Sequence, residues 1–271
     1  MYGQQQQQPM PGPFPPQAPA LFDRSKVELF FSCRSLLNLD TLSKTDCQLK
    51  IFQGTIQGGW VESDRTEIIN DNLNPDFAKS IVTDYIFEQT QKFRVDAIDD
   101  DGHGKFETIG SAIFELGELM GSKNNLLILH LMRDLKTTKK GGQLIVRSEE
   151  VCGINETVKF MFDCQSLNFG GCCGSAGKSF LVLYKPRYDK GNEDSRADWL
   201  KVFQTPVSVK ASGSPGWPAF ELNSSKLCSS DYSRRLKCEW WEFQANGSHI
   251  LKGQVEFSVA QIKADAAHGK W

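Results

Sequence analysis

The stretch "FRVDAIDDDGHGKFETIG", residues 93–110, joins a strand-like run to a strongly acidic segment. Apolar and polar residues mix at near-strand spacing in its first third. Five carboxylates then fall within the twelve positions 96–107, namely Asp96, Asp99, Asp100, Asp101 and Glu107. Because like charges at this density repel one another, a folded chain needs an opposite charge beside them. The segment therefore predicts a site for a cation.

Runs of strand-like composition recur along the chain. β-Branched and aromatic residues alternate with polar ones in "KVELFFSC" (26–33), "GQLIVRSEE" (142–150) and "KSFLVLYK" (178–185), and turn-forming residues separate such runs. This pattern predicts short antiparallel strands arranged in sandwiches. In "LGELMGSKNNLLILHLM" (116–132) we expect a short helical turn followed by a strand.

The chain also repeats itself. Three segments of the first half return in the same order in the second: "VELFFSCRSL" (27–36) as "VKFMFDCQSL" (158–167), "LNPDF" (73–77) more loosely as "SPGWPAF" (214–220), and "FRVDAIDDDGHG" (93–104) as "KCEWWEFQANGS" (237–248). Such a repeat indicates two copies of one domain. We therefore predict an all-β chain with two tandem antiparallel sandwiches, at residues 25–150 and 151–271. A disordered Gln/Pro-rich tail is expected at residues 1–24.

Calcium is the cation that an acidic loop suits best, because it is a hard ion that takes about six to eight oxygen ligands. An EF-hand is excluded: with Gly102 at its sixth position, alanine and threonine occupy the positions of two essential ligands. A second candidate is a site shared between two loops of a sandwich, and the alternative to both is a solvated acidic loop that holds no metal. The stretch "LDTLSKTDC" (39–47) supplies the second acidic loop through Asp40 and Asp46.

This layout resembles a C2 domain, and the chain as a whole resembles a copine. The layout is D-x5-D after the first strand, then "LNP", then D-x-D-x5-[DE]-x-I-G. The stretches that carry the likeness are "LSKTD" (42–46), "DRTEIINDNLNPDF" (64–77), "GGQLIVRSEEV" (141–151), "DYSRRLKCEWW" (231–241) and "NGSH" (246–249). Copines carry two C2 domains followed by a von Willebrand A-type domain. The resemblance implies two eight-stranded C2 sandwiches, the second truncated before its last strand and not followed here by an A-type domain.

The family's calcium ligands fall on five positions of the first repeat: Asp40, Asp46, Asp99, Asp101 and Glu107. Asp96 is expected on the strand, pointing away from the loops, and Asp100 is expected to face solvent. Two residues depart from the family pattern. Glu107 replaces the usual Asp, which we expect to alter affinity, and Cys47 replaces the usual Pro, which we expect to loosen its loop.

The second repeat does not keep this pattern. Gly171 and Lys178 stand at the first pair of ligand positions, and Glu242, Gln244 and Ile250 stand at the others. A lysine beside the site repels calcium. We therefore predict that the second domain binds no calcium and serves as a packing module or as a docking module for protein partners.

The resemblance implies a cytoplasmic, calcium-dependent phospholipid-binding protein that is recruited to the plasma membrane or other anionic membranes, with phosphatidylserine as the expected lipid. The expected membrane contacts are Leu42, Lys44, Lys105 and Phe106. The lysines suit an anionic surface, and the apolar pair either inserts or folds back onto the sandwich. The alternative function is a calcium-independent protein-interaction scaffold built from the two sandwiches.

Other classes find little support. A formal net charge of −2 provides no global basic field for nucleic acid. The four histidines form no recognisable triad or zinc spacing. "GGCCGSAGKS" (170–179) fails the phosphate-loop pattern, because Cys172 stands where the first glycine is needed. We therefore expect no enzyme. The eight cysteines form no C-x-x-C pair, which favours reduced, mostly buried thiols.

Overall fold

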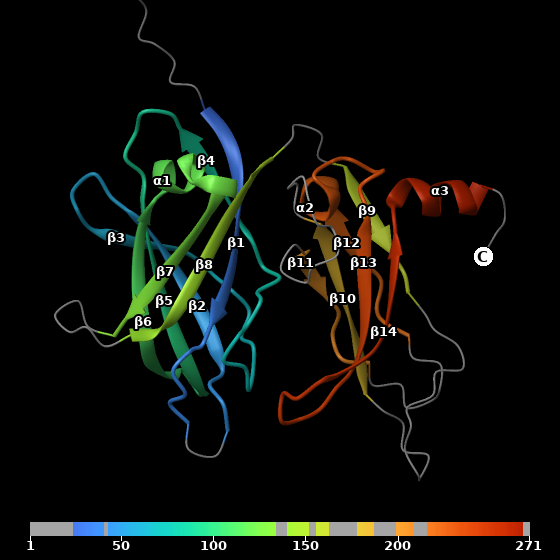
Figure 1. Cartoon of the computed structure of the whole chain (residues 1–271), viewed down its shortest axis with the longest axis horizontal. Coiled ribbons are helices and arrows are strands. Elements are labelled where there is room, and N and C mark those ends of the chain that lie inside the picture. Colours follow the sequence, from blue (N-terminus) through green and yellow to red (C-terminus); the bar gives the residue numbers. More distant parts are fainter. Residues whose placement is uncertain are drawn as a thin grey trace, which may run out of the picture.

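The computed structural model describes residues 24–40, 43–133, 140–151, 156–162, 178–186, 199–208 and 216–267. Figure 1 shows two groups of strands side by side, one from each half of the chain. The tail predicted at residues 1–24 lies outside the described residues, except for Arg24, where the first strand begins. No helix in these described ranges is long and apolar enough to cross a membrane.

The first sandwich is an antiparallel sheet of eight strands that folds on itself in the order β3-β2-β5-β6-β7-β8-β1-β4. Its elements are β1 (Arg24–Arg34), β2 (Cys47–Gly54), β3 (Trp60–Arg65), β4 (Ile81–Ile86), β5 (Lys92–Gly102), β6 (Lys105–Glu115), α1 (Leu116–Gly121), the 3-10 turn η1 (Lys123–Asn125), β7 (Leu126–Met132) and β8 (Lys140–Glu150). The short helix followed by a strand over 116–132 confirms the prediction for that stretch.

The core of this sandwich follows the period of two in its sequence. Along β2, Cys47, Leu49 and Ile51 are buried, while the residues between them are partly exposed. Phe93 of β5 and Phe114 of β6 stack with ring centroids 5.5 Å apart. Since successive side chains of a strand point to opposite faces, this alternation places one face of each strand in the core.

The hairpin of β5 and β6 corrects one expectation. We expected the strand to give way to a loop at the aspartates, but β5 continues to Gly102, which pairs with Lys105. The two residues between them, His103 and Gly104, both have positive φ, as the tight turns of β-hairpins require. The register shifts between Asp100 and Gly102, and such a bulge re-aims the side chains around it.

The second sandwich repeats the pairing of the first. Its described elements are β9 (Thr157–Phe160), β10 (Ser179–Pro186), β11 (Trp199–Gln204), β12 (Phe220–Asn223), α2 (Ser224–Cys228), β13 (Leu236–Glu242), β14 (Ile250–Phe257) and α3 (Val259–Ala267). Strand β9 pairs with β12 as β1 does with β4, and the order β11-β10-β13-β14 matches β3-β2-β5-β6. The strands described here include no counterpart of β7 or β8, where we expected only the last strand to be missing.

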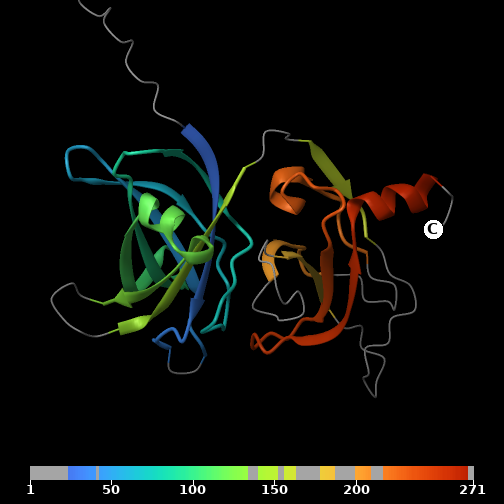
Figure 2. The same ribbon diagram turned by 45° about the horizontal axis from the view of Figure 1, so that its top comes forward.

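The two sandwiches touch along β1. This strand is buried on both faces between Val27 and Phe31, since one face lies in its own core and the other meets the second sandwich. Lys185 of β10 lies with its Nζ 4.7 Å from the centroid of the Phe30 ring and 4.0 Å from Glu28. Figure 2, turned from the first view, again shows β1 on the side that faces the second sandwich.

Candidate calcium site

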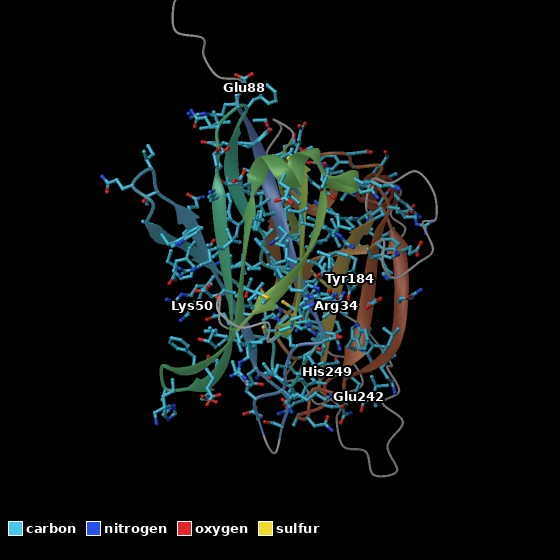
Figure 3. All side chains as sticks on the ribbon, turned by 60° about the vertical axis from the view of Figure 1, so that its left-hand side comes forward. Arg34, Lys50, Glu88, Tyr184, Glu242 and His249 are labelled. Carbon is cyan, nitrogen blue, oxygen red and sulfur yellow. The ribbon has the colours of Figure 1, made fainter. Side chains whose placement is uncertain are left out.

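Three loops of the first sandwich meet at one end of the molecule and enclose an open pocket of about 470 Å³. They are the β1–β2 loop, the segment after β3 and the end of β5. The pocket is lined by Asp40, Asp46, Ile68, Asn70, Asp100, Asp101 and Gly102. In Figure 3, which labels Glu88 at the opposite end, the β5–β6 hairpin reaches this end. The two acidic stretches of the sequence therefore do converge.

Asp46 and Asp99 are held in place by backbone donors. The N–H of Asp46 donates to Oδ1 of Asp99 at 2.7 Å, and the N–H of Asp71 donates to Oδ1 of Asp46 at 2.8 Å. The N–H of Asp100 donates to the carbonyl of Asp46 at 3.0 Å. These bonds tie all three loops together and fix one oxygen of each carboxylate.

The ionised forms of the same two carboxylates are destabilised by burial and by neighbouring negative charges. Burial raises the pKa of Asp46, and the charges of Asp71, Asp40 and Asp100 add to the rise against the hydrogen bond from Asp71. Burial likewise raises the pKa of Asp99, and the charges of Asp40 and Asp101 add to the rise against the backbone N–H of Asp46 and the hydroxyl of Thr45. A cation in the pocket would oppose this rise in pKa, because opposite charge favours the ionised carboxylate.

One oxygen of Asp99 lacks a partner. Asp99 is 2% exposed, and its Oδ2 is buried without a hydrogen bond. Among the described residues, no ion pair joins a lysine or arginine to any carboxylate that lines the pocket. In that same part of the chain, no three His, Cys, Asp or Glu side chains already converge as metal ligands. The donor set has the chemistry for calcium, and its side chains would have to draw closer to share one ion.

The remaining predicted ligands are more exposed. Asp40 accepts a hydrogen bond from Ser43 Oγ at 2.7 Å, and Asp101 is exposed at the hairpin bulge. Glu107 lies directly across from Asp99 in the β5–β6 pair but is exposed and does not line the pocket. Three of the five predicted residues thus line the pocket, Asp99 lies buried against Asp46 beside it, and Glu107 lies across the hairpin from Asp99.

Three neighbours test the finer expectations. Asp96 lies on β5 and pairs with Arg94 at 3.0 Å, away from the pocket, as predicted. Asp100 was expected to face solvent but lines the pocket and accepts the N–H of Gly102. Cys47 does not loosen its loop: it is buried, and its N–H donates to the carbonyl of Ile69, a bond that proline cannot make.

Sequence reasoning missed the third loop. Asn70 lines the pocket, and Asp71, whose φ is 52°, donates to Asp46 and accepts the N–H of Lys44 through Oδ1 at 3.1 Å. The letters "NDN" at 70–72, just before "LNP", are a polar run with turn-forming residues. That run was the available signal for a loop at the site.

Three of the four predicted membrane contacts lie in the described parts of the loops around the pocket. Lys44 and Lys105 are exposed. Phe106 is 50% exposed, and the Nζ of Lys50 lies 3.5 Å from its ring centroid, so one face of the ring is covered by the sandwich. Leu42 lies outside the described residues.

The corresponding end of the second sandwich has different chemistry. Glu242 pairs with Lys252 at 3.3 Å and accepts a hydrogen bond from Gln244 at 3.1 Å. Ile250 is the first residue of β14, and Lys178 is exposed. Gly171 lies outside the described residues. In the part of the chain that the structure describes, the carboxylates that line the pocket of the first sandwich form no ion pair with a lysine or arginine, whereas Glu242 of the second sandwich is neutralised by Lys252.

The comparisons with known proteins agree with this fold. Residues 28–131 match the C2 domain family. The chain is also 27% identical to Copine-C of Dictyostelium discoideum over 93% of its own length, and it spans about half (48%) of that protein. The first sandwich is thus a C2 domain. The chain is a relative of the copines, as its motifs predicted.

Solved C2 structures are weaker matches. The first of the C2 domains of plant extended synaptotagmin 1 is 18% identical with a TM-score of 0.38, covering 46% of this chain and 95% of that one. The calcium-bound pair of C2 domains of extended synaptotagmin 2 is 13% identical with a TM-score of 0.35, covering 88% and 85% of the two chains.

Proposed function

We propose that the chain binds anionic phospholipid membranes in response to calcium, through the acidic pocket of its first C2 domain. The observation that carries the proposal is Asp99, whose Oδ2 is buried without a hydrogen bond and whose Oδ1 is bonded to Asp46, a residue that lines the acidic pocket. Relationship to the copines supports the same function. A buried carboxylate oxygen is expensive to leave unpaired, so a pocket of this kind favours a cation.

Asp46, Asp99, Asp40 and Asp101 would hold the calcium, with Glu107, which lies across from Asp99 in the hairpin, as the fifth ligand. Asp46 and Asp99 each use Oδ1 for a backbone hydrogen bond, which orients their carboxylates before any ion arrives. Asp40 and Asp101 lie in more exposed positions and can move inward. Two fixed and two movable ligands suit a reversible site.

Calcium bound there would supply positive charge and open coordination positions for lipid phosphate oxygens or the carboxylate of phosphatidylserine. Until then, the carboxylates that line the pocket repel an anionic membrane. Lys44 and Lys105, exposed beside the pocket, add attraction to the membrane, and the exposed face of Phe106 offers an apolar contact. The net effect is an electrostatic switch.

In this proposal the second sandwich takes no calcium, because Lys252 already neutralises Glu242. It packs against the first and offers a surface to protein partners. The chain acts as a binding module and not as an enzyme, in the cytoplasm and at the plasma membrane or other anionic membranes.

The test is co-sedimentation of the full chain with phosphatidylserine vesicles across a calcium titration. The wild type should pellet only with calcium, and Asp99→Asn/Asp101→Asn should stay in the supernatant. Calcium at about a hundred times its Kd should also stabilise the wild type by about 2.7 kcal/mol and leave the double variant unchanged.

The matched control is Asp84→Asn/Glu118→Gln, which removes the same charge from β4 and α1, at the other end of the sandwich (Figure 1). It should behave as the wild type does. Vesicle binding that ignores calcium, or no vesicle binding at all, would instead favour the calcium-independent protein-interaction scaffold.

A further inference from the structure

The loop between β13 and β14 touches the first C2 domain beside its acidic pocket. Figures 1 and 2 both show this loop reaching toward the first sandwich. Its Gly247 has a φ of 71°, and a Cβ built there would lie 2.5 Å from Cβ of Asp71, 2.9 Å from the carbonyl oxygen of Asp71 and 3.3 Å from that of Asn70. These separations leave no room for any side chain at position 247.

Asp71 connects this contact to the pocket. Its N–H holds Oδ1 of Asp46, and its own Oδ1 accepts the N–H of Lys44. Asn70, the other residue beneath Gly247, lines the pocket directly. Asp71 also has a positive φ of 52°, a conformation that costs a non-glycine residue energy unless its surroundings hold it. Close packing of Gly247 against Asp71 is one such support.

The β13–β14 loop, called the second-domain loop below, is held in one conformation by its own contacts. The His249 ring stacks on Phe243 with centroids 5.2 Å apart and meets Phe180 edge-on at 4.9 Å, and its Nδ1 accepts the N–H of Gln244. The N–H of Gly247 donates to the carbonyl of Gln244. Figure 3 labels His249 and Glu242 at the same end of the molecule as the β5–β6 hairpin. The loop therefore presents a fixed surface to Asp71.

Further contacts keep the two sandwiches together. The Nζ of Lys201 donates to the carbonyl of Asp76 at 3.0 Å, a short way along the chain from the residues that Gly247 meets. Lys185 pairs with Glu149 at 2.8 Å in a buried position. These contacts between the sandwiches thus hold the second-domain loop against residues 70–71.

We infer that Gly247 is a positioning residue for the calcium site of the other domain. The second-domain loop, which occupies the place of the first domain's acidic hairpin in the repeat, supports Asn70 and Asp71, and through Asp71 it orients Asp46. This inference rests on the proposed calcium function of the first domain. It assigns a role to the second domain that needs no calcium of its own.

The test is Gly247→Asn in the full chain. Asparagine tolerates positive φ, so the substitution adds a side chain with little backbone strain. The control is Gly58→Asn in the turn between β2 and β3, where φ is 84° and an added Cβ meets nothing within 4 Å. Two quantities are measured: hydrogen–deuterium exchange of residues 69–72 without calcium, and calcium affinity by titration calorimetry.

Gly247→Asn should speed exchange at residues 69–72 and weaken calcium binding about two- to thirtyfold, the range by which contacts along a coupling route alter binding. Gly58→Asn should match the wild type in both measurements. Unchanged exchange, or faster exchange with unchanged affinity, overturns the inference alone. If neither the wild type nor the control binds calcium, the proposed function fails and takes this inference with it.

Discussion

Two groups of buried carboxylates in the first sandwich behave in opposite ways. At the domain interface, Glu149 lies 2.8 Å from Lys185 and 3.7 Å from Arg234 and accepts a hydrogen bond from Ser229. Burial by itself would raise the pKa of Glu149, but these cations and hydrogen bonds outweigh it and lower the pKa. Beside the acidic pocket, burial raises the pKa of Asp99, and neighbouring acids add to the rise.

The difference lies in the cations and not in the burial. The second sandwich brings Lys185, Arg234 and Lys201 to acids and carbonyls along the interface. Within the described residues, none of its cations pairs with a carboxylate of the pocket, although Gly247 touches the pocket's outer loop. Lysine and arginine side chains of the chain thus neutralise Glu149 at the interface, while the negative charge of the pocket is left for a ligand to balance.

Removing Lys185 should have the largest effect, because it makes the interface resemble the pocket. Lys185 is fully buried between Glu149 and Glu28, so Lys185→Met leaves two buried carboxylates short of a cation. We expect a loss of about 3 to 5 kcal/mol in the free energy of unfolding, measured by urea denaturation.

The control for that change is Lys159→Met, which removes an exposed lysine that lies 3.9 Å from Glu221. Exposed pairs contribute little, so this variant should stay within about 0.5 kcal/mol of the wild type. Equal losses for the two lysines would mean that the interface pair is no different from a surface pair.

Glu149→Gln sharpens the comparison through pH. The folded-state pKa of Glu149 lies below its ordinary 4.5, so its ionised form stabilises the fold above that pH. Near neutral pH the variant should be about 1 to 3 kcal/mol less stable than the wild type. This difference in stability should shrink as pH falls through the lowered pKa, because the Glu149 side chain of the wild type then becomes neutral as well. Thermal melts from pH 7 down to pH 3 measure it, and a gap independent of pH would contradict the assignment.

The smallest effect is expected at the rim of the pocket. Lys44→Gln and Lys105→Gln should each weaken calcium-dependent vesicle binding about fivefold, because a lysine near an anionic surface contributes about 1 kcal/mol. Calcium affinity without lipid should change little. The control pair is Lys92→Gln/Lys123→Gln, two exposed lysines elsewhere on the sandwich. If the control variant lost as much vesicle binding as the Lys44 and Lys105 variants, the membrane would not dock at this rim.

Sequence reasoning reached the acidic pocket because its two acidic stretches carry recognisable spacing. Asp40, Asp46 and Asp101 do line one pocket, and Asp99 lies buried beside it with its Oδ1 on the N–H of Asp46. It did not reach Asn70 and Asp71, since nothing in a single sequence says which loop folds beside another. It also placed Asp100 in solvent, because the bulge that turns this residue inward is decided by pairing between β5 and β6.

The sequence by itself determined the local facts: alternating strands, a repeat, a run of like charge, and a second copy that has lost that charge. These follow from the period of a strand and from repulsion between neighbouring carboxylates, and both act over a few residues. Only the tertiary structure decided which acids receive a cation. Glu149 meets Lys185 across 36 positions and Gly247 meets Asp71 across 176, and such encounters depend on how two finished sandwiches pack.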